Sequence, residues 1–135
     1  MRVDIRGTRF AAVVTTVVLA VVLATGSFWL LAAQASVFAV GTLLGVGRSP
    51  YGLAFRTLVG PRLGPPTEFE DARPPRFAQG VGLAFALVGL VGYGVGPLWL
   101  GMAATACALA AAFLNAAFGY CLGCEVYLAM RRIAG

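Results

Sequence analysis

The sequence predicts an all-α membrane protein with four transmembrane helices, arranged as two tandem helical hairpins in a single domain over residues 1–135. Three observations support this: a strongly apolar composition, four uncharged apolar segments, and charges confined to the connections and the two ends of the chain. Of the residues, 60% are hydrophobic and 11% are charged, and the mean hydropathy is +0.89. A soluble domain carries about 25% charged residues. In water this chain would expose large apolar patches, so lipid is the expected solvent.

The predicted spans follow from the first and last residues of each uncharged run. They cover residues 10–25, 28–46, 77–93 and 98–120. A helix needs about 20 apolar residues, and no fewer than about 17, to cross the hydrocarbon core. The first and third runs are at or just below this limit, so we expect snorkelling side chains or a locally thinner bilayer at their ends.

The charge distribution predicts the orientation. All ten basic residues are arginine, and each lies before the first span, in the 47–76 connection or after the fourth span, whereas residues 25–27 and 92–97 are uncharged. The positive-inside rule then places both termini and the 47–76 loop on the cytoplasmic side of the inner membrane. We attribute the net charge of +5 to contact with anionic lipids and not with nucleic acid. A signal peptide is the rival interpretation, but no clean small-x-small cleavage motif follows the first span, and cleavage would leave three spans.

The two halves of the chain resemble each other. Residues 9–11 and 76–78 both read Arg-Phe-Ala, and the Trp-Leu pairs at 29–30 and 99–100 follow them. Two hairpins that begin and end on the same side are related by an axis along the membrane normal. We therefore predict a parallel pseudo-repeat, with chance similarity between apolar helices as the alternative. The repeat aligns the cysteine-containing end of the fourth span with the GRSPYG run at 47–52.

The cytoplasmic loop has two parts. Residues 49–63 alternate apolar groups with arginines, which is typical of a segment lying in the headgroup plane. Residues 64–75 contain four prolines, which are expected to exclude a regular helix. This part is predicted to be a stiff connector or a docking surface for a soluble partner, with an acidic face made of Glu68, Glu70 and Asp71.

Two large polar side chains lie inside predicted spans, Gln34 in the second and Asn115 in the fourth. Polar groups in lipid need partners, so they predict either hydrogen bonds between helices or a polar interior of the kind that transporters use.

Cys121 and Cys124 allow three interpretations, which their spacing leaves open. The first is thiol chemistry with these two residues as the active pair and Asn115 and Glu125 as their nearest polar support. The second is a metal site, but a zinc site needs four ligands, and the chain offers one such pair and no histidine. The third is that they are two small residues at a helix end, where a three-residue spacing puts them on one face. The predicted compartment is reducing, so we expect free or cycling thiols and no permanent disulfide.

The runs at residues 6–27, 63–79 and 114–128 resemble a family of bacterial, mainly actinobacterial, integral membrane proteins called domain of unknown function 4395. The strongest part of the resemblance is a pattern made of Asn115, Phe118, Gly119, Cys121, Gly123 and Cys124. The resemblance implies that the cysteine pair and the proline-rich loop belong to the family pattern. It also implies a link to thioredoxin-like and sulfurtransferase proteins.

We therefore expect a membrane thiol-redox or sulfur-transfer component that uses Cys121 and Cys124. The alternatives are a non-catalytic anchor that binds a soluble protein through residues 47–76 and, third, a small transporter. No cofactor, metal or nucleic acid is predicted, a homodimer is compatible with the sequence, and enzymatic activity is left open.

Overall fold

The computed structural model describes residues 2–45, 48–64, 69–71, 73–119 and 121–134. Its four long helices are α1 (Ile5–Thr25), α2 (Phe28–Leu44), α5 (Arg73–Gly94) and α6 (Leu98–Phe118). By length and composition, α1, α5 and α6 are suited to crossing a membrane, and α2 is a shorter apolar helix of 17 residues. The chain is therefore an all-α, multi-pass membrane protein, as the composition predicts.

The helix boundaries differ from the predicted spans mainly at their polar ends. Helix α5 begins at Arg73 and includes Pro74 and Pro75 in its first turn, so the expectation that prolines exclude a helix up to residue 75 is wrong. The first-turn N–H groups of a helix have no intrahelical acceptor, and proline loses nothing there. Helix α2 ends at Leu44, two residues before the predicted boundary, and residue 46 itself lies outside the described part.

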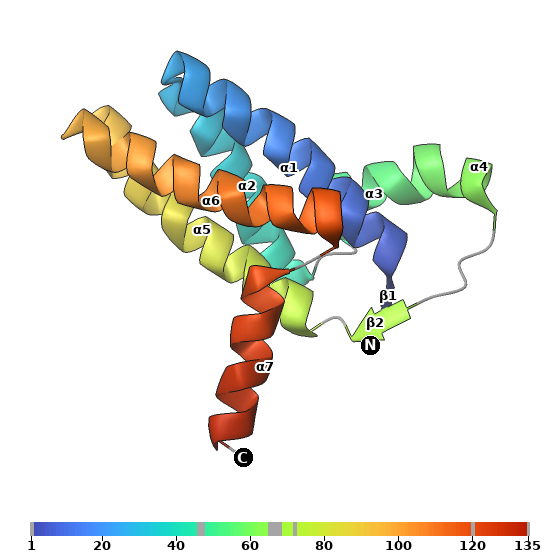
Figure 1. The fold of residues 1–135 in the computed structure, drawn as a ribbon. Coiled ribbons are helices and arrows are strands. Elements are labelled where there is room, and N and C mark those ends of the chain that lie inside the picture. The colour runs from blue at the N-terminus through green and yellow to red at the C-terminus, as the bar shows by residue number, and fades with distance from the viewer. Residues whose placement is uncertain (1, 46–47, 65–68, 72, 120, 135) are drawn as a thin grey trace.

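The four long helices form a bundle in which helices from different halves pack together. Helix α5 packs extensively against α2 and α6, and α1 packs mainly against α6, whereas α1 and α2 share a smaller contact. Consecutive long helices run in opposite directions, and their two short connections lie at the same end of the bundle (Figure 1). The strands and the remaining helices gather at the opposite end.

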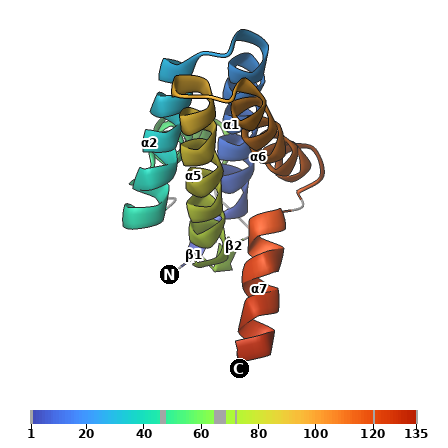
Figure 2. The same ribbon diagram turned by 90° about the vertical axis from the view of Figure 1, so that its left-hand side faces the viewer.

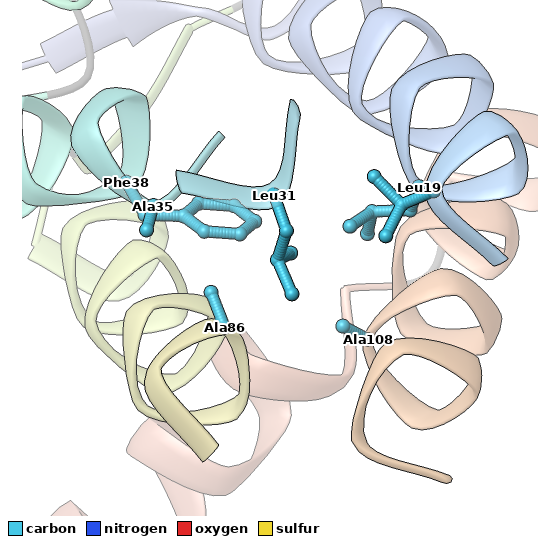
Figure 3. Close-up of a cluster of buried hydrophobic side chains, with 7 residues drawn as sticks. Leu19, Leu31, Ala35, Phe38, Ala86 and Ala108 are labelled. Atoms are coloured by element: carbon cyan, nitrogen blue, oxygen red, sulfur yellow. The ribbon is translucent and has the colours of Figure 1, made fainter. Parts of the chain in front are cut away.

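The core lies where all four helices face one another. Leu19 of α1, Leu31 and Phe38 of α2, Ala86 of α5 and Ala108 of α6 converge there (Figure 3). The outward faces of the bundle carry large exposed apolar side chains, which include Val17, Leu87, Val91 and Met102. Apolar faces of this extent are those of a bundle surrounded by lipid.

A short antiparallel strand pair, which the sequence did not predict, joins the N-terminus to the loop. Strand β1 (Arg2–Asp4) pairs with β2 (Phe69–Asp71), with Val3 opposite Glu70. Two residues of the predicted acidic face, Glu70 and Asp71, thus belong to β2, and the third, Glu68, lies outside the described residues. Part of the loop predicted as a connector is therefore fixed to the start of the chain.

The first part of the loop is helical. It consists of α3 (Pro50–Ala54), the π-helical turn η2 (Phe55–Val59) and α4 (Gly60–Leu63), which follow one another without a break. The Ser49 hydroxyl accepts a hydrogen bond from the Gly52 N–H at 3.1 Å and so caps the start of α3. Phe55 is buried, and its ring centroid lies 5.8 Å from that of Phe10 in α1. The segment is thus held to α1 at the end of the bundle.

Candidate dithiol site

The cysteine pair lies where the chain turns out of the fourth long helix. Helix α6 ends at Phe118, and Gly119 follows with a φ of 70°, a left-handed conformation that glycine adopts without strain. The Gly119 N–H donates to the main-chain oxygen of Asn115 at 2.9 Å, which closes the helix end. After this turn a new helix, α7 (Leu122–Ala134), begins. Cys121 immediately precedes it.

Cys121 caps the start of α7 with its sulfur. The Cys124 N–H donates to Cys121 Sγ at 3.1 Å, and the Glu125 N–H donates to the main-chain oxygen of Cys121 at 3.0 Å. The two cysteines are therefore not two positions on one helical face: Cys121 is the N-cap residue, and Cys124 lies in the first turn. The positive end of a helix dipole and a directed N–H group both favour negative charge on the capping atom.

The structure contains the pair in its oxidised form. A disulfide joins Cys121 and Cys124, whose Cα atoms are 5.1 Å apart, and both residues are half-buried. The expectation of free thiols does not describe this form of the protein. The expectation of a cycling pair includes a disulfide as one of its two states, and the role of the pair in redox chemistry remains a prediction.

Helix α7 is held against α5 by a close backbone contact. A Cβ at Gly123 would lie 2.6 Å from Ala78 Cβ and 2.7 Å from Ala78 Cα, so only glycine fits there. One turn further along, the ring of Tyr127 packs on Phe77, with centroids 5.6 Å apart. Gly123, which lies between the two cysteines, thus fixes the position of the disulfide relative to the bundle.

Arg9 supports the same corner from α1, and the sequence reasoning did not identify it as a site residue. Its Nη2 donates to the main-chain oxygen of Ala116 at 3.1 Å, in the last turn of α6. A Cβ at Gly119 would lie 3.9 Å from the guanidinium carbon of Arg9. The signal that could have found Arg9 is its place in the repeated Arg-Phe-Ala motif.

The second copy of that motif makes the corresponding contact in the other half. Arg76 donates from Nε to the Thr42 oxygen at 2.5 Å and from Nη2 to the Leu43 oxygen at 2.6 Å, in the last turn of α2. Each motif arginine at the start of a long helix therefore binds the C-terminal carbonyls of a long helix from the other half. A cation is favourable there because a helix C-terminus carries a partial negative charge.

The segments that follow α2 and α6 also correspond. Ser49 caps α3 through its hydroxyl, and Cys121 caps α7 through its sulfur, each accepting an N–H three residues on at 3.1 Å. The motif phenylalanines follow the same pattern, because Phe10 packs on Phe55 after the first cap and Phe77 packs on Tyr127 after the second. Sulfur therefore replaces a capping hydroxyl in the second half of the chain.

The predicted support residues have limited contact with the pair. Asn115 contributes its main-chain oxygen to the helix end, and within the described residues its amide forms no hydrogen bond to either cysteine. The Glu125 side chain is exposed in the first turn of α7, where a negative charge stabilises the helix start. Nothing in these contacts tests a catalytic role for Asn115 or Glu125.

Gln34 belongs to a different part of the molecule. It is buried in α2, and its Oε1 accepts a hydrogen bond from the Tyr51 hydroxyl at 2.5 Å. Burial raises the pKa of Tyr51 above its usual value, so the phenol stays a neutral donor at physiological pH. The Gln34 Nε2 has no partner among the described residues. This bond attaches α3 to α2, which is the structural role that the sequence allowed for Gln34.

The fold and the site together define a class: a multi-pass membrane protein with a Cys-x-x-Cys pair at one end of its helical bundle. Within that class, the chain belongs to the family described as a domain of unknown function (DUF4395), whose model matches residues 3–132. No curated protein and no solved structure matches it.

Proposed function

We propose that this protein is a membrane thiol–disulfide exchange component in which Cys121 is the attacking thiol and Cys124 the resolving thiol. The observation that carries the proposal is the hydrogen bond from the Cys124 N–H to Cys121 Sγ at the start of α7. In the reduced protein the same N–H group and the helix N-terminus favour a thiolate at Cys121, and the thiolate is the nucleophile in exchange reactions. Arg9 and Gly123 position the corner that holds it.

The exchange balances with one partner. The Cys121 thiolate attacks a sulfur of a partner's disulfide, which forms a mixed disulfide and releases one partner thiolate. The Cys124 thiol then loses its proton and attacks Cys121 Sγ, which forms the Cys121–Cys124 disulfide and releases the second partner thiolate. Two electrons pass from the pair to the partner, and two protons end on the partner's dithiol. The reverse reaction, with a partner dithiol as reductant, regenerates the pair.

A thioredoxin-like protein is the partner class that fits this chemistry, since it carries a dithiol of its own. The sulfur-transfer alternative uses the same thiolate. Cys121 would attack the outer sulfur of a persulfide on a sulfurtransferase, become a persulfide itself and release the partner's thiolate. The mass of the protein after incubation distinguishes the two, because only the second reaction adds a sulfur atom.

The proposal includes the membrane topology of two tandem hairpins, with α2 as the fourth span and both termini and the 47–76 loop cytoplasmic. Two features support it. Trp29 and Trp99, at the starts of α2 and α6, are 79% and 67% exposed, and amphipathic rings favour the membrane interface. The described arginines Arg9, Arg76, Arg131 and Arg132 belong to helix ends at the opposite end of the bundle (Figure 1).

The redox midpoint of the pair tests the exchange function. The full chain with Cys107→Ser, which removes the remaining cysteine, is equilibrated in lipid nanodiscs with glutathione buffers of graded potential. An exchanging pair should have its midpoint between about −180 and −270 mV, the range of exchange proteins. A pair that stays oxidised below about −300 mV behaves as a structural disulfide, and that result would contradict the proposal.

A second candidate function is a membrane anchor for a soluble protein, and the exposed face of the α3–α4 segment favours it. Leu53, Leu58, Arg56 and Arg62 are all exposed there. Co-purification with the wild-type chain and with a Leu53→Ser, Leu58→Ser variant distinguishes the functions. An anchor loses its partner in this variant and keeps it when both cysteines are replaced, whereas an exchange partner shows the opposite dependence.

A further inference from the structure

We infer that the exposed apolar face of α7 lies in the headgroup region of an anionic bilayer, so that the membrane itself holds the helix that carries the cysteines. The face consists of Val126, Met130 and Ile133, which are 49%, 53% and 88% exposed. Their spacing of four and then three residues puts them on one side of the helix. Large apolar side chains that are this exposed and adjacent mark an interaction surface.

The other sides of α7 have different surroundings. Gly123 and Tyr127 contact Ala78 and Phe77 of α5. Cys124 and Arg131 are seven residues apart and therefore share a side that differs from the apolar face. Arg131 is exposed and donates to the Tyr127 hydroxyl at 3.3 Å. The apolar face and the cysteine side thus flank the α5 contact on its two opposite sides.

The bilayer is the occupant that the position and charge of α7 favour. The helix begins three residues after α6, an apolar helix long enough to cross a membrane, has ended. It then leaves the bundle and extends past the end of α5 (Figures 1 and 2). Its last turn carries Arg131 and Arg132, both exposed. An amphipathic helix with arginines beside its apolar face is typical of binding at an anionic membrane surface.

The consequence is a fixed orientation of the pair. With Val126, Met130 and Ile133 inserted among the lipids, the side that bears Cys124 and Arg131 is turned toward water. A soluble partner could then reach the disulfide while α7 stays at the membrane.

Spin labels on the two faces of α7 test this inference independently of the thiol chemistry. The full chain carries Cys107→Ser, Cys121→Ser and Cys124→Ala, where serine at 121 keeps a capping hydroxyl like that of Ser49. Either Ile133→Cys or Leu128→Cys is then labelled, because both residues are exposed and apolar but lie on opposite sides of the helix. The protein is placed in nanodiscs of equimolar phosphatidylcholine and phosphatidylglycerol, and collisions with oxygen and with a water-soluble nickel complex are measured.

The ratio of oxygen to nickel collisions should be several-fold higher at position 133 than at position 128. Arg131→Gln together with Arg132→Gln should lower the ratio at 133 in these nanodiscs but not in pure phosphatidylcholine, while the Leu128 label, which reports whether α7 stays folded, keeps its value. Equal ratios at the two positions would overturn the inference. So would spin–spin broadening at 133 that disappears on dilution with unlabelled protein, because a second copy would then cover the face. An unchanged ratio at 133 after the arginine substitutions would overturn the role of anionic headgroups.

Discussion

Cys121 performs a structural task that serine performs in the other half of the chain. Ser49 and Cys121 both accept an N–H at the start of a helix, and serine is the better capping residue because its oxygen is a stronger acceptor. A cap alone therefore does not require sulfur. The presence of Cys124 one turn further on gives the sulfur at 121 a partner, and this pairing is the residue-level argument for chemistry.

Single cysteine substitutions should separate the attacking thiol from the resolving thiol. A Cys124→Ser variant leaves Cys121 at the cap and should accumulate a mixed disulfide with a thioredoxin-like protein, because no resolving thiol is present. The Cys121→Ser variant should form far less of this species. Non-reducing electrophoresis and mass spectrometry measure the adduct, and equal trapping by both variants would contradict the assignment.

Gly123→Ala should weaken the contact between α7 and α5. The added methyl carbon would lie 2.6 Å from Ala78 Cβ, and overpacking of this kind costs about 1–3 kcal/mol. Thermal unfolding in detergent measures the loss of stability. The matched control is Gly123→Ala combined with Ala78→Gly, which removes the clashing Cβ and should recover part of the loss. No loss in the single variant would show that α7 does not depend on this contact.

Tyr51→Phe should destabilise the protein by about 1–3 kcal/mol, because the buried Gln34 Oε1 would lose its donor. Replacing both residues, with Tyr51→Phe and Gln34→Leu, should be closer to neutral, since no buried acceptor is then left unpaired. Chemical denaturation of the three variants in one detergent provides the comparison. A double variant less stable than Tyr51→Phe would indicate a further role for Gln34.

At the scale of elements, the long helices were predictable and the parts around them were less so. Uncharged runs set the centres of α1, α2, α5 and α6 because charge is excluded from lipid. The start of α5 at Arg73 and the pairing of β1 with β2 depend on first-turn geometry and on a contact between residues 67 positions apart, such as Val3 and Glu70. The break at Gly119 depends on a backbone conformation that spacing does not reveal, so the cap at Cys121 was missed although the pair itself was found.

The two motif arginines should act as helix caps of similar strength. Arg9→Gln removes the bond to Ala116, and Arg76→Gln removes the bonds to Thr42 and Leu43. Each change should cost about 0.3–2 kcal/mol, and because they affect different helix ends the losses should add within about 0.5 kcal/mol. Unfolding of the single and double variants tests this. Only Arg9→Gln should also alter trapping at Cys121, and an equal effect of Arg76→Gln would remove the specific link between Arg9 and the cysteine corner.

At the scale of the whole molecule, the bundle is assembled from contacts between its halves. Helix α1 packs mainly on α6, and α2 on α5, and the motif arginines bridge the same pairs. This exchange of contacts is what a two-fold pseudo-repeat about the membrane normal would produce, and it supports the repeat that the Arg-Phe-Ala and Trp-Leu landmarks predict. The difference between the halves is concentrated after the second one, where the cap is a cysteine and the helix that follows extends beyond the bundle (Figure 2).

The state of the cysteine pair in living cells tests the central claim most directly. Cells that express the Cys107→Ser chain are quenched in acid before, during and after exposure to a thiol oxidant, and free thiols are then labelled with a mass-tagged maleimide. A parallel sample is labelled with a membrane-impermeant maleimide before and after the cells are opened. The account predicts a dithiol that converts to the disulfide under oxidant, recovers afterwards, and reacts with the impermeant reagent only in opened cells. A pair that stays oxidised throughout, or thiols labelled from outside intact cells, would contradict it.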